Sequence, residues 1–196
     1  MRREVKQHFK KVDPILFRVS EQAGELKDII PQRPSEYFSS LCREIVAQQL
    51  GSGAAHAILG RFHNLFPQKK SRPSYIVAIQ AGELRKCGMS WGKARYIKDL
   101  AQKVTTREVV LSKLSSLSDE EVIIELTKIK GIGPWTAEMF LMFSLGREDI
   151  FSFGDLGLRN AMKKLYGEKK QEPIVARWSP YRSFASRILW RIIDEK

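Results

Sequence analysis

The chain has 196 residues, of which 43% are hydrophobic and 29% are charged, and its formal net charge is +12. This length allows one large domain or two small lobes with a buried core. The surplus of positive charge favours a polyanionic partner, because each neutralised phosphate releases counterions. Charge alone fits RNA and acidic membranes as well as DNA. No run of about 18 apolar residues occurs, which argues against a membrane-spanning helix.

Cysteine and histidine usage argues against the common metal centres. Two cysteines, Cys42 and Cys87, cannot supply a four-thiolate iron–sulfur site, and the three histidines lack the spacing of zinc ligands. Cys42 lies on an apolar helical face, which favours packing over a disulfide. The basic N-terminus is followed by no apolar signal-peptide core. We therefore expect a monomer, cytoplasmic and nucleoid-associated if the source is bacterial and nuclear if it is eukaryotic.

Apolar residues recur at intervals of three and four along most of the chain, which is typical of amphipathic helices. In the first half of the chain, the sequence predicts a helix capped by Ser35, a helix capped by Ser52, a charged loop over 67–73 and a helix over 91–104. The capping box of Ser118 and Glu121 opens the next helix, and another begins at Pro134. A helix over 156–165 stops near Gly167, and a last helix covers about 180–193. Trp91 is expected in the core, and Trp178 is expected to be structural.

The sequence lacks sustained alternation of apolar and polar residues, internal repeats and low-complexity segments. We therefore predict an all-α fold, with a single domain over 1–196 made of two helical lobes and a helical hairpin at about 119–145.

The most informative segment is the predicted hairpin, where Gly131-Ile132-Gly133 separates two helical patterns. A tight turn at this point exposes backbone N–H groups at the start of the second helix, and such a helix N-terminus binds phosphate without a side-chain charge. Asp155 follows the second helix and directly precedes another. A phosphate-binding turn followed by a carboxylate, in a very basic chain, indicates chemistry on DNA.

These residues resemble a known family. The chain resembles the helix-hairpin-helix DNA glycosylases, and more narrowly the 3-methyladenine DNA glycosylase II family. Four segments carry the resemblance and occur in the order of that family: Ile45–Leu50, Gly131–Ala137, Gly154-Asp155-Leu156-Gly157 and Trp178–Ser183. The resemblance covers roughly 34–190. It implies a two-lobed helical glycosylase fold. Bacterial members often carry an N-terminal β-rich domain, for which this chain has no room, so we expect only the helical core.

Asp155 matches the catalytic aspartate of that family. Breaking an N-glycosidic bond builds positive charge on the sugar, and a fixed carboxylate stabilises that charge and orients or deprotonates the attacking water. The alternative is that Asp155 only caps the helix beginning at Leu156, and the two roles are compatible. Asp149 is the competing carboxylate, and the resemblance favours a structural role for it.

The residue two positions after Gly133 bears on the reaction type. Glycosylases that also cut the backbone need an amine there to form a Schiff base, and this chain has Trp135. The sequence therefore predicts a monofunctional enzyme that releases the base, leaves an abasic site and needs no catalytic cofactor.

Several residues are expected to contact DNA phosphates. The candidates in the hairpin are the backbone N–H groups of Gly131 and Gly133 and the hydroxyl of Thr136. Two further candidates, Ser90 and Lys93, lie near another turn. Similar hairpins hold a monovalent cation, Na⁺ or K⁺, through backbone carbonyls. In this chain the corresponding carbonyls belong to Thr127, Ile129 and Ile132.

The target base must be flipped into a pocket, and aromatic faces favour a cationic alkylated base. Trp135 and Trp190 are the candidates, with core packing as the alternative for each. The best-known bacterial relatives have aromatic residues where this chain has Met139 and Leu156, which leaves fewer stacking faces.

The gap left in the duplex must be filled by a wedge. Gln48, Gln49 and Leu50 resemble the family's inserting segment, with Gln49 favoured, and a polar helix end is the alternative.

The sequence thus predicts a glycosylase that excises alkylated purines, such as 3-methyladenine and 7-methylguanine, from double-stranded DNA in base excision repair. Two alternatives stay open. One is a helix-hairpin-helix protein that binds lesions or abasic sites without catalysis, and the other is a glycosylase for oxidised or deaminated bases.

Overall fold

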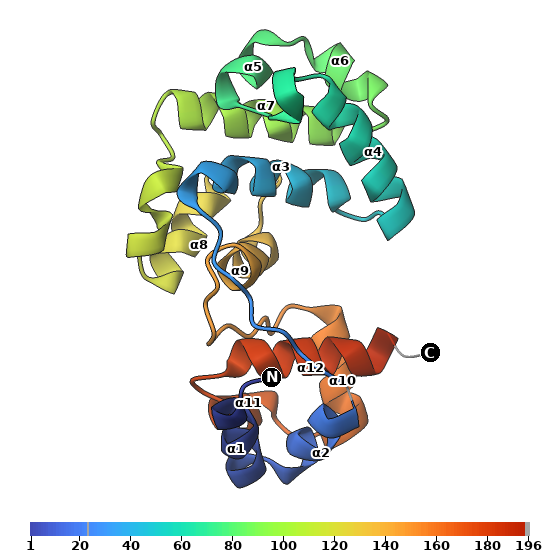
Figure 1. Cartoon of the computed structure of the whole chain (residues 1–196), viewed down its shortest axis with the longest axis vertical. Coiled ribbons are helices and arrows are strands. Elements are labelled where there is room, and N and C mark those ends of the chain that lie inside the picture. Colours follow the sequence, from blue (N-terminus) through green and yellow to red (C-terminus); the bar gives the residue numbers. More distant parts are fainter. Residues whose placement is uncertain (23, 195–196) are drawn as a thin grey trace. The chain divides into compact units, whose positions relative to one another are not determined.

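The computed structural model describes residues 1–22 and 24–194, and all regular structure in that part of the chain is helical. Chain contacts divide the protein into two compact units, which we describe separately. Unit 1 comprises Met1–Pro31 and Leu141–Lys196, and unit 2 comprises Gln32–Phe140. The chain therefore enters and leaves unit 2 once, through the loop after α2 and through helix α9 (Figure 1).

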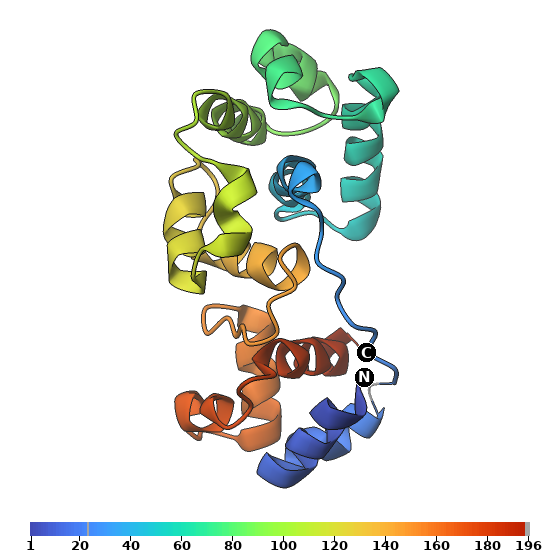
Figure 2. The ribbon, with the colours of Figure 1, turned by 60° about the vertical axis from the view of Figure 1, so that its left-hand side comes forward.

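Unit 2 is built around the 15-residue helix α7. Its elements are η1 (Pro34–Glu36), α3 (Tyr37–Ala47), α4 (Ser52–Asn64), η2 (Pro67–Lys69), α5 (Pro73–Ala78), α6 (Ala81–Lys86), α7 (Trp91–Thr105), η3 (Leu111–Ser116), α8 (Asp119–Thr127) and most of α9 (Pro134–Phe143). Ala94, Ile97, Leu100 and Ala101 form the buried stripe of α7. The helix packs against α5, α6 and α3 (Figure 2).

Unit 1 consists of α1 (Arg3–Val12), α2 (Pro14–Gln22), α10 (Leu156–Tyr166), α11 (Gln171–Ala176) and α12 (Arg182–Asp194). Helices α10 and α12 make its most extensive contact. Its core holds a buried carboxylate, Asp13, which accepts hydrogen bonds from the Tyr166 hydroxyl at 2.9 Å, the Trp178 indole at 2.9 Å and the Leu16 amide at 3.0 Å. Because burial and the neighbouring Asp13 both disfavour its ionised form, the pKa of Tyr166 is raised.

Most predicted elements are confirmed. The capping box of Ser118 and Glu121 opens α8, α9 begins at Pro134, and Gly167 ends α10 with a positive φ of 67°. Trp178 is fully buried, as a structural residue should be, and both cysteines are free and buried. Among the described helices, none combines the length and apolar character needed to cross a lipid bilayer.

The predicted caps differ in detail. Ser35 lies inside the short 3₁₀ turn η1, so the helix begins two residues later, at Tyr37. Ser52 is the first residue of α4, and Gly51 occupies the capping position. The last helix begins at Arg182 rather than near 180.

The prediction for Trp91 is wrong, because its side chain is 53% exposed. Trp91 is the first residue of α7, directly after the Ser90 cap. Helical side chains lean toward the N-terminus, so a residue at this position covers surface beyond the end of its own helix.

Candidate functional site

The loop between α8 and α9 forms the predicted hairpin turn in unit 2. Gly131 has a φ of +83°, a conformation that L side chains rarely adopt, and a Cβ at this residue would lie 2.1 Å from the ring of Tyr96. Both requirements make glycine necessary. Gly131 and Gly133 are exposed, and the first bond within α9 runs from the Ala137 amide to the Gly133 carbonyl at 3.1 Å. In an α-helix the first N–H groups generally lack a carbonyl one turn back, so a turn that leads into a helix N-terminus can offer N–H groups to an anion.

Polar side chains of helix α7 contact the backbone of the hairpin. The Asp99 carboxylate accepts a hydrogen bond from the Lys130 amide at 2.8 Å. Lys103 lies 3.2 Å from that carboxylate and also donates to the carbonyl of Lys128, the residue that caps α8. The two side chains are only 17% and 16% exposed. Their shielding from water strengthens these polar contacts, which fix the backbone of the turn.

The predicted wedge segment is a turn that follows α3. Gln49 has a φ of 56°, and both Gln49 and Leu50 are exposed. Lys93 of α7 fixes this turn, because its Nζ donates to the carbonyls of Val46 at 2.8 Å and Gln48 at 2.6 Å. Desolvation lowers the pKa of Lys93. The structure therefore gives Lys93 two backbone partners within the protein, and its contact with a DNA phosphate stays a prediction.

Gln48 joins the wedge turn to the hairpin. Its amide Nε2 donates to the Gly131 carbonyl at 2.8 Å and lies 3.5 Å from the Thr136 hydroxyl. Thr136 is buried, so its side chain is directed at Gln48 rather than at solvent. Of the three predicted wedge residues, Gln48 thus has an internal role, and Gln49 and Leu50 remain available for insertion into DNA.

A pocket of about 620 Å³ opens beside the wedge turn. It is lined by Glu44, Ala47, Gln48, Gln49, Leu50, Trp135 and Thr136. Burial raises the pKa of Glu44. Trp135 is 43% exposed, which is consistent with a contact residue and not with the core alternative, whereas Met139 is buried.

Two further predictions concern turns of unit 2. Ser90 accepts a hydrogen bond from the Lys93 amide at 3.2 Å and so caps α7. Among the proposed cation-binding carbonyls, that of Ile129 accepts the Ile132 amide at 3.1 Å, which closes the turn. A carbonyl oxygen has a second lone pair, so this bond is compatible with a cation.

Asp155 is held rigidly in unit 1. Its Oδ1 accepts the Leu158 amide at 2.7 Å, which caps α10, and the indole Nε1 of Trp190 at 3.1 Å. Gly157 permits this arrangement, because a Cβ there would lie 3.0 Å from Oδ1 and 3.3 Å from Trp190 Cδ1. Both hydrogen bonds fix the orientation of the carboxylate. Asp155 therefore caps α10, a role that is compatible with catalysis, and its catalytic role stays a prediction.

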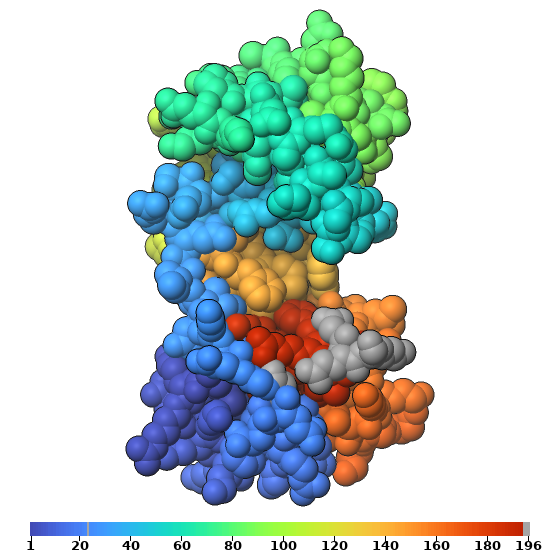
Figure 3. Space-filling view, turned by 45° about the vertical axis from the view of Figure 1, so that its right-hand side comes forward, coloured from blue at the N-terminus to red at the C-terminus, as the bar shows by residue number. Residues whose placement is uncertain are grey.

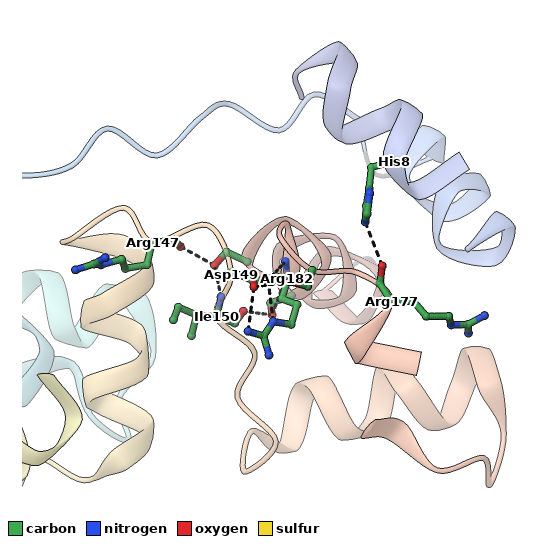
Figure 4. A network of polar contacts seen from close by, with 9 residues as sticks. His8, Arg147, Asp149, Ile150, Arg177 and Arg182 are labelled. Atoms are coloured by element: carbon green, nitrogen blue, oxygen red, sulfur yellow. Dashed lines mark hydrogen bonds and ion pairs between the residues drawn. The ribbon is translucent and has the colours of Figure 1, made fainter. Parts of the chain in front are cut away.

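Helix α12 also anchors the segment that leads to Asp155 (Figure 4). Arg182 forms a two-point ion pair with Asp149, through Nε at 2.8 Å and Nη2 at 3.0 Å. Ser183 donates to the Arg147 carbonyl at 2.7 Å and accepts the Ile150 amide at 2.9 Å. These contacts support the structural role predicted for Asp149.

Burial alone would raise the pKa of Asp149, but hydrogen bonds from Arg182 and Ser179 outweigh it, and the pKa lies below the ordinary value. Asp149 therefore stays ionised and paired with Arg182 at neutral pH. A carboxylate in this state is suited to anchoring a loop and unsuited to exchanging protons during catalysis.

Aromatic residues near Asp155 extend the predicted set. The ring of Phe143 lies 6.1 Å from that of Trp190 at an interplanar angle of 30°. Phe143 and Phe153 are 39% and 43% exposed, and Leu156 is 63% exposed. The predicted site includes neither Phe143 nor Phe153. Phe153 could have been predicted as a site residue, because it lies two residues before Asp155.

The structure thus groups the predicted residues into two sets. Asp155, Leu156 and Trp190 lie together in unit 1, whereas Trp135, the wedge turn and the hairpin lie together in unit 2. The residues that sequence reasoning missed are the supporting side chains Tyr96, Asp99 and Lys103. Their spacing of three and four on α7 places them on one side of the helix, but the apolar pattern of α7 drew attention to the opposite side.

Comparison with known proteins identifies relatives of this chain. A family model described as the HhH-GPD superfamily base excision DNA repair protein matches residues 42–177. The DNA-3-methyladenine glycosylase 1 of Schizosaccharomyces pombe is 33% identical over 197 residues, which cover 94% of this chain and 84% of that protein. The putative DNA-3-methyladenine glycosylase YfjP of Bacillus subtilis is 33% identical over 169 residues, which cover 80% of this chain and 59% of YfjP. The match thus spans less than two thirds of YfjP.

Solved structures agree with this result. A DNA-3-methyladenine glycosidase from Bacillus halodurans superimposes with a TM-score of 0.83 at 37% identity, over 99% of this chain and 92% of that one. The S. pombe 3-methyladenine DNA glycosylase in complex with abasic DNA gives a TM-score of 0.80 at 30% identity, over 97% of both chains. The all-α glycosylase fold and the family resemblance predicted from the sequence are confirmed. This chain belongs to the HhH-GPD superfamily of base excision DNA repair proteins.

Proposed function

We propose that this protein is a monofunctional DNA glycosylase that hydrolyses the N-glycosidic bond of alkylated purines, such as 3-methyladenine and 7-methylguanine, in double-stranded DNA. The observation that carries the proposal is the orientation of Asp155 by the α10 amide and the Trp190 indole, at 2.7 Å and 3.1 Å. Relatives named as DNA-3-methyladenine glycosylases support the substrate class.

Asp155 supplies the chemistry in this proposal. As the bond to the base breaks, positive charge develops on the sugar, and the ionised carboxylate stabilises it. Because Leu158 and Trp190 already fix its position, Asp155 needs little reorganisation during the reaction. The same carboxylate orients or deprotonates the attacking water. The base departs and an abasic sugar remains, since Trp135 provides no amine for a Schiff base.

The unit 2 residues hold the DNA. Amides of Gly131 and Gly133 bind a phosphate, and a monovalent cation at the carbonyls of Thr127, Ile129 and Ile132 would reinforce that contact. Gln49 or Leu50 fills the gap left by the flipped nucleotide. Trp135 offers an exposed aromatic face for stacking. We expect the enzyme to act as a monomer on DNA in the cytoplasm or nucleus.

The test is single-turnover release of 3-methyladenine and 7-methylguanine from methylated duplex DNA by wild type and Asp155→Asn. Asparagine keeps the helix cap but removes the charge, so the variant should fold and bind abasic DNA while excision falls by at least about 10²–10³-fold. Strand breaks should appear only after alkali. Asp149→Asn is the matched control, because it neutralises a nearby carboxylate assigned to structure.

The capping bond of Asp155 favours a second candidate, a lesion-binding protein without catalysis, because that bond alone explains an aspartate at this position. Tight binding to abasic DNA with no release of any base, including hypoxanthine and oxidised bases, would support this candidate. Release of only hypoxanthine or an oxidised base would keep the enzyme and change its substrate.

A further inference from the structure

A second concave region of unit 2 is strongly basic. It has a volume of about 530 Å³ and lies where the start of α3 meets the segment after α4. Figure 3 shows these segments on one face, in light blue and teal. The lining residues are Arg33, Ser35, Glu36, Ser39, Arg43, His63, Lys69, Lys70, Ser71 and Arg72. Five of these are lysine or arginine and one is acidic. We call this region the basic pocket.

The single carboxylate of the basic pocket is already engaged. Glu36 accepts the Arg33 amide at 2.9 Å and lies 3.6 Å from the Arg33 guanidinium. Within the described residues, no carboxylate lies at ion-pair distance from Arg43, Lys69, Lys70 or Arg72. Lys69, Lys70 and Arg72 therefore border the concavity without a carboxylate partner among the described residues, whereas Arg43 also interacts with the charge of Glu44.

Two further groups suit an anionic guest. Ser71 Oγ is buried and has no hydrogen-bond partner among the described residues, so a donor is available. His63 is partly desolvated, and burial together with the Arg43 charge lowers its pKa. Its neutral ring can still donate one hydrogen bond. Burial and the Arg43 charge thus both disfavour the protonated form of His63. A bound anion at this side of the basic pocket would offset the repulsion between the two side chains.

The basic pocket is separate from the DNA-binding residues proposed above. None of its lining residues lines the pocket beside Trp135. The wedge turn follows the last residue of α3, whereas Glu36 and Ser39 lie at its start, and a helix of this length spans about 15 Å. Likewise α4 begins at the wedge turn and carries His63 in its last turn, about 17 Å along the axis.

We propose that the basic pocket is a second phosphate-binding site, with a phosphate ester as its ligand. The arrangement of cationic side chains around a concave surface with serine hydroxyls matches the charge and the acceptor oxygens of such a group. Two sources share this chemistry. One is the backbone of a nucleic-acid strand that continues beyond the lesion site, and the other is a free phosphate compound.

The experiment uses the full chain and follows backbone amide resonances during titration with inorganic pyrophosphate. Resonances of residues 69–72 should shift saturably, whether or not those of 131–137 also shift. The variant Lys69→Gln/Lys70→Gln/Arg72→Gln should weaken this binding by about tenfold or more. Its matched control is Lys164→Gln/Lys169→Gln/Lys170→Gln, which removes the same charge from exposed residues of unit 1 and should leave the affinity unchanged.

Every outcome bears on the proposal. No saturable shift at 69–72, or equal weakening in the two triple variants, overturns it. Base excision is measured separately, so a loss of the proposed enzymatic function would not be confused with a loss of this site.

A second arm identifies the source of the phosphate. If a strand occupies the basic pocket, a 30-base-pair duplex should displace pyrophosphate from residues 69–72, and the triple variant should lower the salt dependence of duplex binding by up to about two to three charges. If the duplex binds without displacing pyrophosphate, the ligand is a free phosphate compound. Saturable shifts at residues 69–72 with an acidic peptide, but with neither pyrophosphate nor the duplex, would replace this proposal with a protein-binding one.

Discussion

Helices α7 and α12 perform comparable tasks in the two units, and they use different chemistry. Each is a long helix whose polar side chains hold loop backbone in place. On α7, three lysines each donate to carbonyls where another helix ends. Lys93 contacts the end of α3, Lys98 contacts the last turn and C-cap of α5, and Lys103 contacts the end of α8. Positive charge at a helix C-terminus is favourable, so α7 stabilises three helix ends at once.

Helix α12 instead holds a carboxylate. Arg182, Ser186 and Trp190 recur every four residues, and they contact Asp149, the Ile150 carbonyl and Asp155 respectively. The difference suggests a division of labour, in which α7 shapes a surface whose backbone binds DNA and α12 orients a group that reacts. Substitutions on the α7 side should therefore change affinity, and those on the α12 side should change the rate.

The largest effect is expected at the hairpin. Gly131→Ala would place a methyl group 2.1 Å from the Tyr96 ring at a φ of +83°, so the turn must move. We expect affinity for abasic duplex DNA to fall about 100-fold by fluorescence anisotropy, with a lower Tm. Gly60→Ala is the control, because nothing lies within 4 Å of the added Cβ. Unchanged affinity in Gly131→Ala would show that the turn does not bind phosphate.

Trp190→Phe should separate rate from affinity. The substitution removes the 3.1 Å hydrogen bond to Asp155 and keeps an aromatic ring. We expect the single-turnover excision rate to fall about tenfold while affinity for abasic DNA stays within about twofold. Trp91→Phe, at an exposed tryptophan of α7, should alter neither quantity. A loss of affinity as large as the loss of rate would indicate that Trp190 acts by stacking on DNA.

Local patterns in the sequence sufficed for the helices and for the two key turns. The capping box at Ser118, the first-turn proline Pro134 and the stop at Gly167 depend on neighbouring residues only, and all three are confirmed. Asp155 could be singled out because it precedes a helix and matches a family motif. Its capping bond follows from the same local geometry.

The long-range contacts could not be predicted from one sequence. Lys93 and Gln48 appeared to be surface residues facing DNA, yet their partners lie 45–47 and 83–88 residues away in the chain. A lysine that binds a carbonyl in another helix leaves no periodic signature, because its amine extends well beyond its own turn. For Trp91 a local pattern was misleading. Its spacing fits the core stripe of α7, but it is the first residue of that helix.

The wedge turn offers a smaller effect with a closely matched control. Lys93→Met removes the bonds to the Val46 and Gln48 carbonyls and keeps the length of the side chain. Because Gln49 and Leu50 would lose their fixed position, we expect base extrusion to slow about three- to fivefold, as reported by 2-aminopurine fluorescence. Lys98→Met removes equivalent bonds on the same helix, away from the wedge turn, and should affect Tm but not extrusion. Equal slowing in both variants would assign the effect to stability alone.

The smallest effect concerns acid stability in unit 1. The pKa of Asp149 is lowered in the folded protein, so its ion pair with Arg182 contributes stability above the unfolded pKa of about 3.9, and this contribution is lost as the pH falls through the folded value. The pair is about one-third exposed, so screening limits the contribution to about 0.5–1 kcal/mol. Urea unfolding of Asp149→Asn should therefore show a deficit of this size at pH 7 that shrinks as the pH falls below about 3.9 and through the lowered folded pKa. A deficit that persists in acid would mean that the carboxylate's hydrogen-bond geometry, and not its charge, holds the segment before Asp155.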